Sequence, residues 1–281
     1  MRKIGKEIET VSLIGVGFVA GLIASRVGHY NFSLRLYDKD PKIQLKNKMV
    51  VNRIKRDKKK HGVSGNVTIH DTLAEAVADA DLVLESVPEK IDIKKRVFAE
   101  IDKLAPSHAI IATNSSSIPV SQIEDVVKRK DKVLNIHFYP PIIKTPMADI
   151  MRGTQTSDDT FEKGKKWIEA IHCTPLVVKK ECKGFVFNRV WHAIKKECLK
   201  IWAGGYADIE TVDTAWKIWT GMRIGLFKMM DGVGLDVVYD IEMSYFNESG
   251  DLNDKPPDEL LEKIKKGELG NKAGKGFYIY K

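Results

Sequence analysis

Residues 11–24 read VSLIGVGFVAGLIA, and this stretch indicates the fold of the first part of the chain. A short β-rich run leads into GVGFVA, which is the GxGxxA form of the dinucleotide-binding fingerprint. Gly15 permits a tight turn, Gly17 lets a pyrophosphate approach the backbone at a helix N-terminus, and Ala20 lets the helix pack on the sheet. A glycine-rich turn of this kind is also compatible with a purely structural role, so the motif needs a second signal.

The second predicted strand supplies that signal. It ends in LRLYD, with Asp38 about 20 residues beyond the glycine turn, where a carboxylate can accept hydrogen bonds from the adenosine ribose hydroxyls. The same carboxylate would repel a 2′-phosphate. The pair of motifs therefore predicts NAD as the cofactor in preference to NADP, although the cation of Lys39 beside Asp38 weakens this inference.

The first 180 residues or so alternate β-rich runs with helical periodicity, as in Ile91–Leu104 and Asp159–Ile171. Strands that alternate with helices predict right-handed βαβ units and an α/β, Rossmann-type, mostly parallel sheet. The predicted strands are Thr10–Ile14, Ser33–Tyr37, Val67–Ile69, Leu82–Glu85, Ala109–Thr113, Val133–Ile136, Met147–Met151 and Pro175–Lys179.

From Gly184 onward, helical patterns replace the alternation. We therefore predict two domains, a nucleotide-binding domain over residues 1–183 and an all-helical domain over residues 184–281. The helical patterns cover Phe185–Ala203, Ile209–Trp219, Asp236–Asn247 and Asp258–Lys266.

The composition is that of an ordinary globular protein, with 43% hydrophobic and 30% charged residues among 281. No apolar run approaches the roughly 18–20 residues that a membrane helix needs, and the charged start does not read as a signal peptide. Three cysteines without CxxC spacing predict neither a disulfide framework nor a zinc site. These features predict a cytoplasmic protein with no membrane partner and no bound metal.

The formal net charge of +8 arises largely from one lysine-rich stretch at residues 39–60. One interpretation is a solvated amphipathic helix whose buried side carries Ile43, Met49, Val50 and Ile54. The other is a patch for a polyanionic small molecule. No motif of a nucleic-acid-binding fold accompanies the stretch, so nucleic acid is not a predicted partner.

Six further segments, taken together and in order, identify a family. The chain resembles the L-3-hydroxyacyl-CoA dehydrogenase family over nearly its whole length. The resemblance implies NAD-dependent oxidation of L-3-hydroxyacyl-CoA to 3-oxoacyl-CoA, as in fatty acid β-oxidation, by a homodimer that associates through its helical domain. The segments are ESVPEKIDIKK, TNSSSIP, HFYPP with TPMAD, KGFVFNR, DGVGLD and GNKAGKGFYIY.

The resemblance implies that His137 in HFYPP is the general acid/base. Taking the proton of the 3-hydroxyl while hydride leaves C3 needs a base that titrates near neutrality, which suits histidine. Asp149 stands where the family normally carries a glutamate that orients this histidine. Aspartate can do the same work, but it is shorter by one carbon–carbon bond of about 1.5 Å.

Other site residues follow from the same resemblance. Ser116 matches the serine that hydrogen-bonds the substrate's 3-oxygen, although Ser115 and Ser117 on either side leave that choice open. Asn188 in GFVFNR matches the asparagine that helps polarise the same oxygen. A helix cap is its structural alternative.

Three more residues are expected beside the cofactor. Glu89 and Lys94 match family residues near the nicotinamide half. Asn114 is expected at the carboxyl end of a strand, where open α/β sheets bind ligands.

The chain also departs from the family pattern. Pro140 replaces an asparagine beside the histidine, and GMRIGLFKMMD places Arg223 where the family has GxPMGPFELLD. The helical hairpin after the second strand is also shorter than in typical members. The GMR run, VPEKIDIKK and the short hairpin resemble the L-gulonate dehydrogenase type, whose substrate is a free hydroxy acid that Arg223 would bind.

The leading hypothesis remains an acyl-CoA substrate, with basic residues facing the CoA phosphates. A third hypothesis is a catalytically weakened structural protein of this fold, against which the retention of Ser116, His137 and Asn188 argues. The residues expected to face the phosphates are Lys42, Lys46, Lys48 or Arg53.

Overall fold

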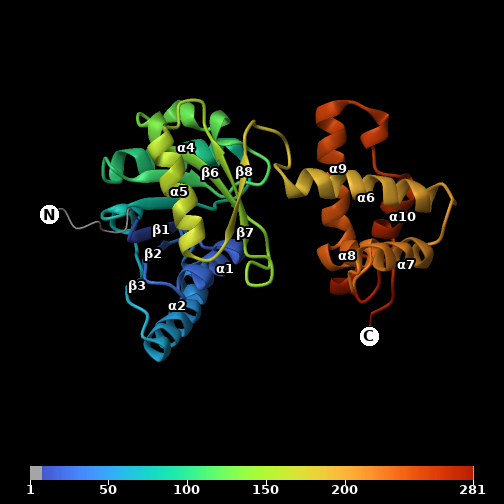
Figure 1. Cartoon of the computed structure of the whole chain (residues 1–281), viewed down its shortest axis with the longest axis horizontal. Coiled ribbons are helices and arrows are strands. Elements are labelled where there is room, and N and C mark those ends of the chain that lie inside the picture. Colours follow the sequence, from blue (N-terminus) through green and yellow to red (C-terminus); the bar gives the residue numbers. More distant parts are fainter. Residues whose placement is uncertain (1–7, 281) are drawn as a thin grey trace. The chain divides into compact units, whose positions relative to one another are not determined.

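The structure is a computed structural model that describes residues 8–280. It divides into two compact units whose boundary along the chain lies between Val186 and Phe187, slightly after the predicted domain boundary. The first unit is an eight-stranded sheet with helices on both faces, and the second is built of helices (Figure 1). This architecture confirms the predicted fold class, a mostly parallel Rossmann-type sheet followed by an all-α part.

The strand order across the sheet is β3-β2-β1-β4-β5-β6-β7-β8, and every neighbouring pair is parallel except β6–β7. The predicted bounds of the first four strands are confirmed. β6 runs two residues further than predicted, to Phe138, which places His137 inside the strand. The strands are Thr10–Ile14 (β1), Ser33–Tyr37 (β2), Val67–Ile69 (β3), Leu82–Glu85 (β4), Ile110–Thr113 (β5), Val133–Phe138 (β6), Met147–Arg152 (β7) and Thr174–Val178 (β8).

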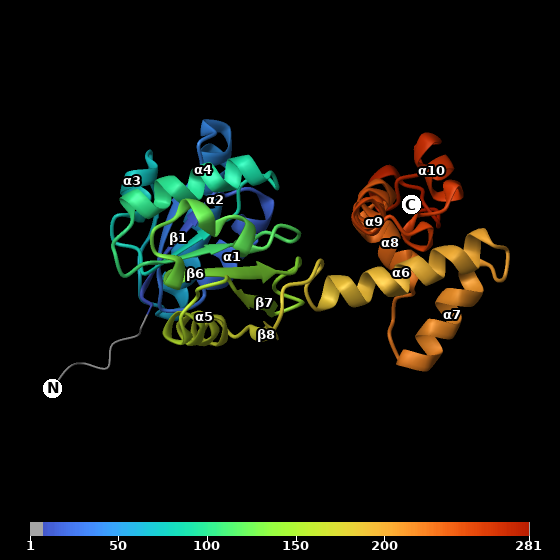
Figure 2. The same ribbon diagram turned by 90° about the horizontal axis from the view of Figure 1, so that it is seen from above.

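The central strands are buried on both faces because helices cover each side of the sheet. Successive residues of a strand point to opposite faces, so Val83 packs with the α3 and α4 side chains whereas Leu84 packs with those of α1, α2 and α5. Figure 2 shows α4 and α5 on opposite sides of the sheet. The helices are Phe18–Val27 (α1), Pro41–His61 (α2), Leu73–Val77 (α3), Ile91–Leu104 (α4) and Asp158–Ala170 (α5).

The lysine-rich stretch forms the single long helix α2, as the first interpretation predicted. Asp40 caps its first turn by accepting from the backbone N–H of Lys42. The prediction that Met49 lies on the buried side is wrong, because its side chain is 72% exposed. Ile54 is buried, as predicted, and Val51 is buried with it, because their spacing keeps both on the face of the helix that packs on the sheet.

The second unit packs its helices around an apolar core that includes Leu199, Phe227 and Phe277. All four predicted helices agree with the structure to within two residues at each end, and α8 was not predicted. Among the described residues, no helix is both long and apolar enough to cross a membrane. The helices are Phe187–Ala203 (α6), Ile209–Thr220 (α7), Leu226–Val233 (α8), Leu235–Ser249 (α9) and Asp258–Lys265 (α10).

The closing GKGFYIY segment is fixed to a buried carboxylate in α8. Asp231 accepts hydrogen bonds from the backbone N–H groups of Phe277 and Tyr278 and from the hydroxyl of Tyr280. A Cβ at Gly276 would lie 2.1 Å from an Asp231 oxygen, so only glycine fits there. This segment therefore closes the core of the second unit.

Candidate active site

The glycine turn after β1 has the geometry that a dinucleotide requires. Gly15 has a φ of +81°, and a Cβ there would lie 2.8 Å from the backbone nitrogen of Val87. Gly17 is the N-cap of α1, and no side chain of residues 8–280 accepts a hydrogen bond from the first helical N–H groups. Apart from its chain neighbours and the backbone of its own helix, no described atom lies within 4 Å of a Cβ built on Gly17. Open space over unpaired N–H groups at a helix N-terminus suits a pyrophosphate. Ala20 is buried and lets α1 pack on the sheet, as expected.

Asp38 follows β2 directly and lines a cavity of about 430 Å³ together with Gly15. Burial raises the pKa of this carboxyl, while backbone hydrogen bonds from Asp40 and Val16 act in the opposite direction. A carboxylate that has lost much of its water is a strong acceptor for ligand hydroxyls. The cavity is otherwise lined largely by apolar side chains, which suits an adenine ring.

Two cations line the same cavity, Lys39 and Arg96. Sequence analysis noted Lys39 but missed Arg96, which lies in α4, far along the chain from the fingerprint. No sequence signal identifies Arg96, because only the packing of α4 beside the β1–α1 turn brings it to this cavity.

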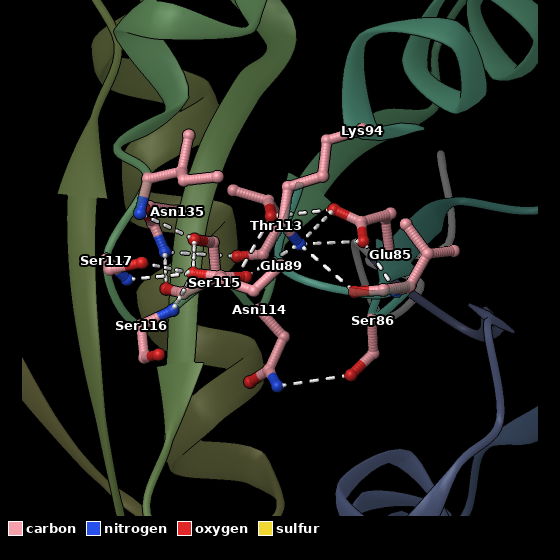
Figure 3. A network of polar contacts seen from close by, with 12 residues as sticks. Glu85, Ser86, Glu89, Lys94, Thr113, Asn114, Ser115, Ser116, Ser117 and Asn135 are labelled. Carbon is pink, nitrogen blue, oxygen red and sulfur yellow. Dashed lines mark hydrogen bonds and ion pairs between the residues drawn. The ribbon is translucent and has the colours of Figure 1, made fainter. Parts of the chain in front are cut away.

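A polar network lies at the carboxyl ends of β4 and β5, where Glu85 and Thr113 are the last strand residues (Figure 3). The ammonium of Lys94 lies between two carboxylates, 3.0 Å from Oε1 of Glu85 and 3.1 Å from Oε2 of Glu89. The hydroxyl of Thr113 also donates to Glu85. The structure thus brings the predicted pair, Glu89 and Lys94, together, and it adds Glu85, which sequence analysis did not single out.

The two carboxyl groups of this network have opposite pKa shifts. Glu85 is fully buried, and desolvation raises its pKa in spite of Lys94 and Thr113. Glu89 is partly exposed; desolvation acts to raise its pKa as well, but the charge of Lys94 and hydrogen bonds from the serine loop lower it to about 2. Glu89 is therefore ionised at neutral pH and acts as an acceptor for that loop.

The serine loop at residues 115–117 is held by a single oxygen of Glu89. Its Oε1 accepts from the hydroxyls of Ser115 and Ser117 and from the backbone N–H groups of Ser116 and Ser117. The hydroxyl of Ser116 has no hydrogen bond to any described residue, and its side chain is exposed. Of the three serines, Ser116 alone keeps its hydroxyl available for a ligand.

Asn114 connects this loop to the neighbouring strands. Its side-chain oxygen accepts from the backbone N–H of Phe138, and its amide donates to the hydroxyl of Ser86. These contacts place Asn114 at the carboxyl ends of β4, β5 and β6, as predicted. They also join the serine loop to the residue that follows His137.

His137 and Asp149 are directly opposed in the antiparallel pair β6–β7. Nδ1 of His137 lies 3.2 Å from Oδ2 of Asp149, and both side chains are buried. Phe185 packs against the imidazole with ring centroids 5.4 Å apart. The structure therefore brings together the two residues that sequence analysis predicted as a pair.

Tyr139 also contacts this pair, and sequence analysis missed it. Its hydroxyl donates to the same Oδ2 of Asp149, and its ring meets that of His137 edge-on at a centroid distance of 4.6 Å. The available signal was spacing, because residues two apart at a strand end share a face.

Asn188 and Arg223 belong to the second unit and are described there alone. Asn188 is half-buried in the first turn of α6. Arg223 is exposed between α7 and α8 and forms no ion pair with the described part of the chain.

Two family models match the chain. One, described as 3-hydroxyacyl-CoA dehydrogenase, NAD binding domain, covers residues 10–182. The other, described as 3-hydroxyacyl-CoA dehydrogenase, C-terminal domain, covers residues 184–280. Together they account for both units.

Individual proteins and a solved structure agree with these models. A probable 3-hydroxybutyryl-CoA dehydrogenase of Bacillus subtilis is 30% identical over 98% of this chain and 98% of its own length. The crystal structure of (S)-3-hydroxybutyryl-CoA dehydrogenase from Ralstonia eutropha matches with a TM-score of 0.85 and 26% identity, over 98% of this chain and 99% of that one.

A relative with a different substrate is similar to the same extent. The 5-formyl-3-hydroxy-2-methylpyridine 4-carboxylate 5-dehydrogenase of Mesorhizobium japonicum is 29% identical over 97% of this chain and 91% of its own length. Similarity at this level therefore identifies a dehydrogenase with an NAD-binding domain but does not select one substrate.

Proposed function

The chain belongs to the 3-hydroxyacyl-CoA dehydrogenase family, and from this premise we propose that it oxidises an L-3-hydroxyacyl-CoA to the 3-oxoacyl-CoA, reversibly and with NAD. The observation that carries the proposal is the buried pair of His137 and Asp149 at the strand ends, beside the loop that presents the Ser116 hydroxyl. A base and a hydroxyl donor on the same sheet as a dinucleotide turn are the groups that alcohol oxidation needs.

His137 acts in this proposal as the general acid/base. Its Nδ1 donates to Asp149, so the free Nε2 takes the proton of the substrate's 3-hydroxyl. NAD, when bound, supplies the acceptor for the hydride that leaves C3. The negative charge of Asp149 stabilises the imidazolium that forms, and the hydroxyl of Ser116 donates to the substrate oxygen. Asn188 of the second unit is proposed as a further hydrogen-bond donor to the substrate, as the family resemblance implies.

The residues of the first unit fit the cofactor. In the proposal, Gly15 and Gly17 accommodate the pyrophosphate, Ala20 seats the helix behind it, and Asp38 accepts from the adenosine ribose. Asn114 and the ion pair of Glu89 with Lys94 border the nicotinamide half.

The basic helix α2 supports a CoA thioester as the substrate. Lys46 and Arg53 line a second cavity of about 430 Å³, together with Gly17 and Phe18. Of the four predicted candidates, Lys42, Lys46, Lys48 or Arg53, we infer that Lys46 and Arg53 face the phosphates of CoA, because these two line the cavity. This reaction belongs to fatty acid β-oxidation.

We further infer a homodimer that associates through the second unit. Trp219 is 90% exposed and Ile218 79% exposed, and large apolar side chains at such positions are typical of association surfaces. A cytoplasmic location is the accompanying proposal, which rests on the odd number of cysteines in the sequence.

A free hydroxy acid is the alternative substrate class, as in the L-gulonate dehydrogenase type. The exposed guanidinium of Arg223 favours it, because an arginine pairs well with a carboxylate. The pyridine carboxylate named for the Mesorhizobium relative is likewise a free carboxylate and not a CoA ester.

Steady-state kinetics distinguish the two substrate classes. In one set of assays, the loss of NADH absorbance measures the reduction of acetoacetyl-CoA and longer 3-oxoacyl-CoAs. In the other, the gain of NADH absorbance measures the oxidation of free 3-hydroxy acids. We expect turnover of the CoA esters, with a loss of roughly 10²–10⁴-fold in His137→Ala. His108→Ala, an exposed histidine paired with Asp81, is the control and should keep full activity. Turnover of free acids alone would replace the acyl-CoA proposal by the alternative, and NAD binding without turnover of either class would favour a structural role.

A further inference from the structure

We propose that Tyr139 is a positioning residue, whose hydroxyl fixes the Asp149 carboxylate so that this carboxylate can hold His137 in one tautomer. The inference rests on the proposed role of His137 as the general acid/base. Tyr139 then acts together with His137 and Asp149, and it contacts the carboxylate of Asp149 and not the substrate.

The geometry of the carboxylate carries the proposal. Asp149 is 1% exposed, and its Oδ2 receives both the Tyr139 hydroxyl and Nδ1 of His137. Its other oxygen, Oδ1, is buried and accepts no hydrogen bond within residues 8–280. Oδ2 of Asp149 therefore accepts both of the side-chain hydrogen bonds described for this carboxylate, one from Tyr139 and one from His137.

The contact with the histidine is long for a hydrogen bond to an ionised group. Nδ1 of His137 and Oδ2 of Asp149 are 3.2 Å apart, whereas hydrogen bonds to ionised groups are usually about 2.7–2.9 Å. An aspartate carboxylate rotates about its terminal torsion, which has broad minima. The hydroxyl of Tyr139 therefore supplies the second contact that holds Oδ2 toward the imidazole.

Tyr139 is itself rigidly held. Its side chain is 6% exposed, and its ring packs edge-on against His137. Its backbone carbonyl accepts from the hydroxyl of Thr145, which ties the end of β6 to the loop that leads to β7. The hydroxyl thus reaches Asp149 from a fixed ring, so little conformational freedom is lost in making the contact.

The tautomer is the functional consequence. A carboxylate that faces Nδ1 keeps the proton on Nδ1 and leaves Nε2 free to accept one. If the carboxylate turns away, the neutral imidazole redistributes between its two tautomers, and a part of the enzyme carries its proton on the wrong nitrogen. Loss of the Tyr139 hydroxyl should therefore lower kcat without altering the binding of either substrate.

A double-mutant cycle in the full-length enzyme tests the coupling. Tyr139→Phe should lower kcat roughly tenfold, the effect of losing one hydrogen bond, with KM for NAD and for acetoacetyl-CoA within about twofold of wild type. The separate variant Asp149→Ala should have a lower kcat than Tyr139→Phe. The double variant should then be no slower than Asp149→Ala alone, because the tyrosine acts only through the carboxylate. Tyr278→Phe is the matched control, because its hydroxyl also donates to a carboxylate, that of Asp213, in the second unit.

Nitrogen-15 NMR of the His137 ring tests the same idea without substrate. The wild type should show protonated Nδ1, and Tyr139→Phe should show a mixture of tautomers, whereas Tyr278→Phe should match the wild type. Independent, additive effects in the cycle, or an unchanged tautomer in Tyr139→Phe, would overturn the proposal. If the wild type turns over no CoA ester, the proposed function fails, and the NMR comparison still decides the role of Tyr139.

Discussion

The ammonium of Lys94 lies 3.0 Å from Oε1 of Glu85, and both side chains are almost completely buried. A buried ion pair contributes little net stability compared with apolar residues, but removing one partner leaves an uncompensated charge. Here a second carboxylate, Glu89, also depends on the same lysine and holds the serine loop. Lys94 therefore links the stability of the carboxyl end of β4 to the position of Ser116.

Lys94→Met should destabilise the protein by about 3–5 kcal/mol, because it strands Glu85 in the core. Denaturant unfolding measures this loss. Lys95→Met is the matched control on the next residue, whose ion pair with Asp125 is at the surface and contributes about 0–1 kcal/mol. Equal losses of unfolding free energy in the two variants would show that Glu85 is accommodated without Lys94.

The two glycines of the fingerprint should respond differently to alanine. Gly15→Ala introduces a side chain at a φ of +81° and against the backbone of Val87, so we expect clear destabilisation as well as weaker NAD binding. Gly17→Ala meets no protein atom, and the changed N-cap costs at most about 1 kcal/mol. Its Cβ projects where the pyrophosphate should lie.

Calorimetric titration with NAD and thermal unfolding of both variants check this prediction. The expected result for Gly17→Ala is near-normal unfolding with NAD affinity reduced at least roughly tenfold, or about 1.4 kcal/mol. Unchanged NAD affinity in Gly17→Ala would mean that the pyrophosphate does not approach this turn.

Asp38→Ala should weaken NAD binding and narrow the preference for NAD over NADP. The change removes the ribose acceptor together with the repulsion of a 2′-phosphate. Two lost hydrogen bonds at about 0.5–1.5 kcal/mol each correspond to roughly 5–150-fold in affinity. Michaelis constants for NAD and NADP measure the effect, with Lys39→Ala as the companion variant. If Asp38→Ala changes neither Michaelis constant, Lys39 or Arg96 in the same cavity binds the ribose instead.

Much of the fold could be predicted because periodicity is a local property of the sequence. The alternation of β-rich and helical runs indicated the sheet, and the bounds of β1 to β4 agree with it. The exposed position of Met49 was missed because α2 is polar around most of its circumference, so a lysine-rich sequence defines its buried face poorly.

The site was less predictable, because its contacts join residues from different strands. The motif NSSS does not say which hydroxyl is available; that follows from Glu89, which occupies the hydroxyls of Ser115 and Ser117 and leaves that of Ser116. The contact of Tyr139 with Asp149 forms only because β7 pairs antiparallel with β6, which places Asp149 opposite His137.

Asp149 gives the sharpest test of the histidine–carboxylate pair, because it is an aspartate in a position where the family carries glutamate. Asp149→Asn keeps the size of the side chain and removes its charge, so the imidazolium that forms during oxidation loses its stabilising partner. Turnover should fall at least roughly tenfold on the scale of general acid/base effects. Since a less basic imidazole stays neutral to lower pH, the rising limb of hydroxyacyl oxidation should move to lower pH.

Asp149→Glu separates charge from geometry in the same position. The longer side chain keeps the negative charge but must fit in a buried space opposite His137, where the Tyr139 hydroxyl already meets the carboxylate. We expect it to retain more activity than Asp149→Asn and to leave the rising limb of the pH profile near its wild-type position. Rates of 3-hydroxyacyl-CoA oxidation measured across the pH range give both quantities. If Asp149→Asn leaves the rate and the pH profile unchanged, Asp149 is a bystander, and His137 either takes its orientation from another group or is not the base.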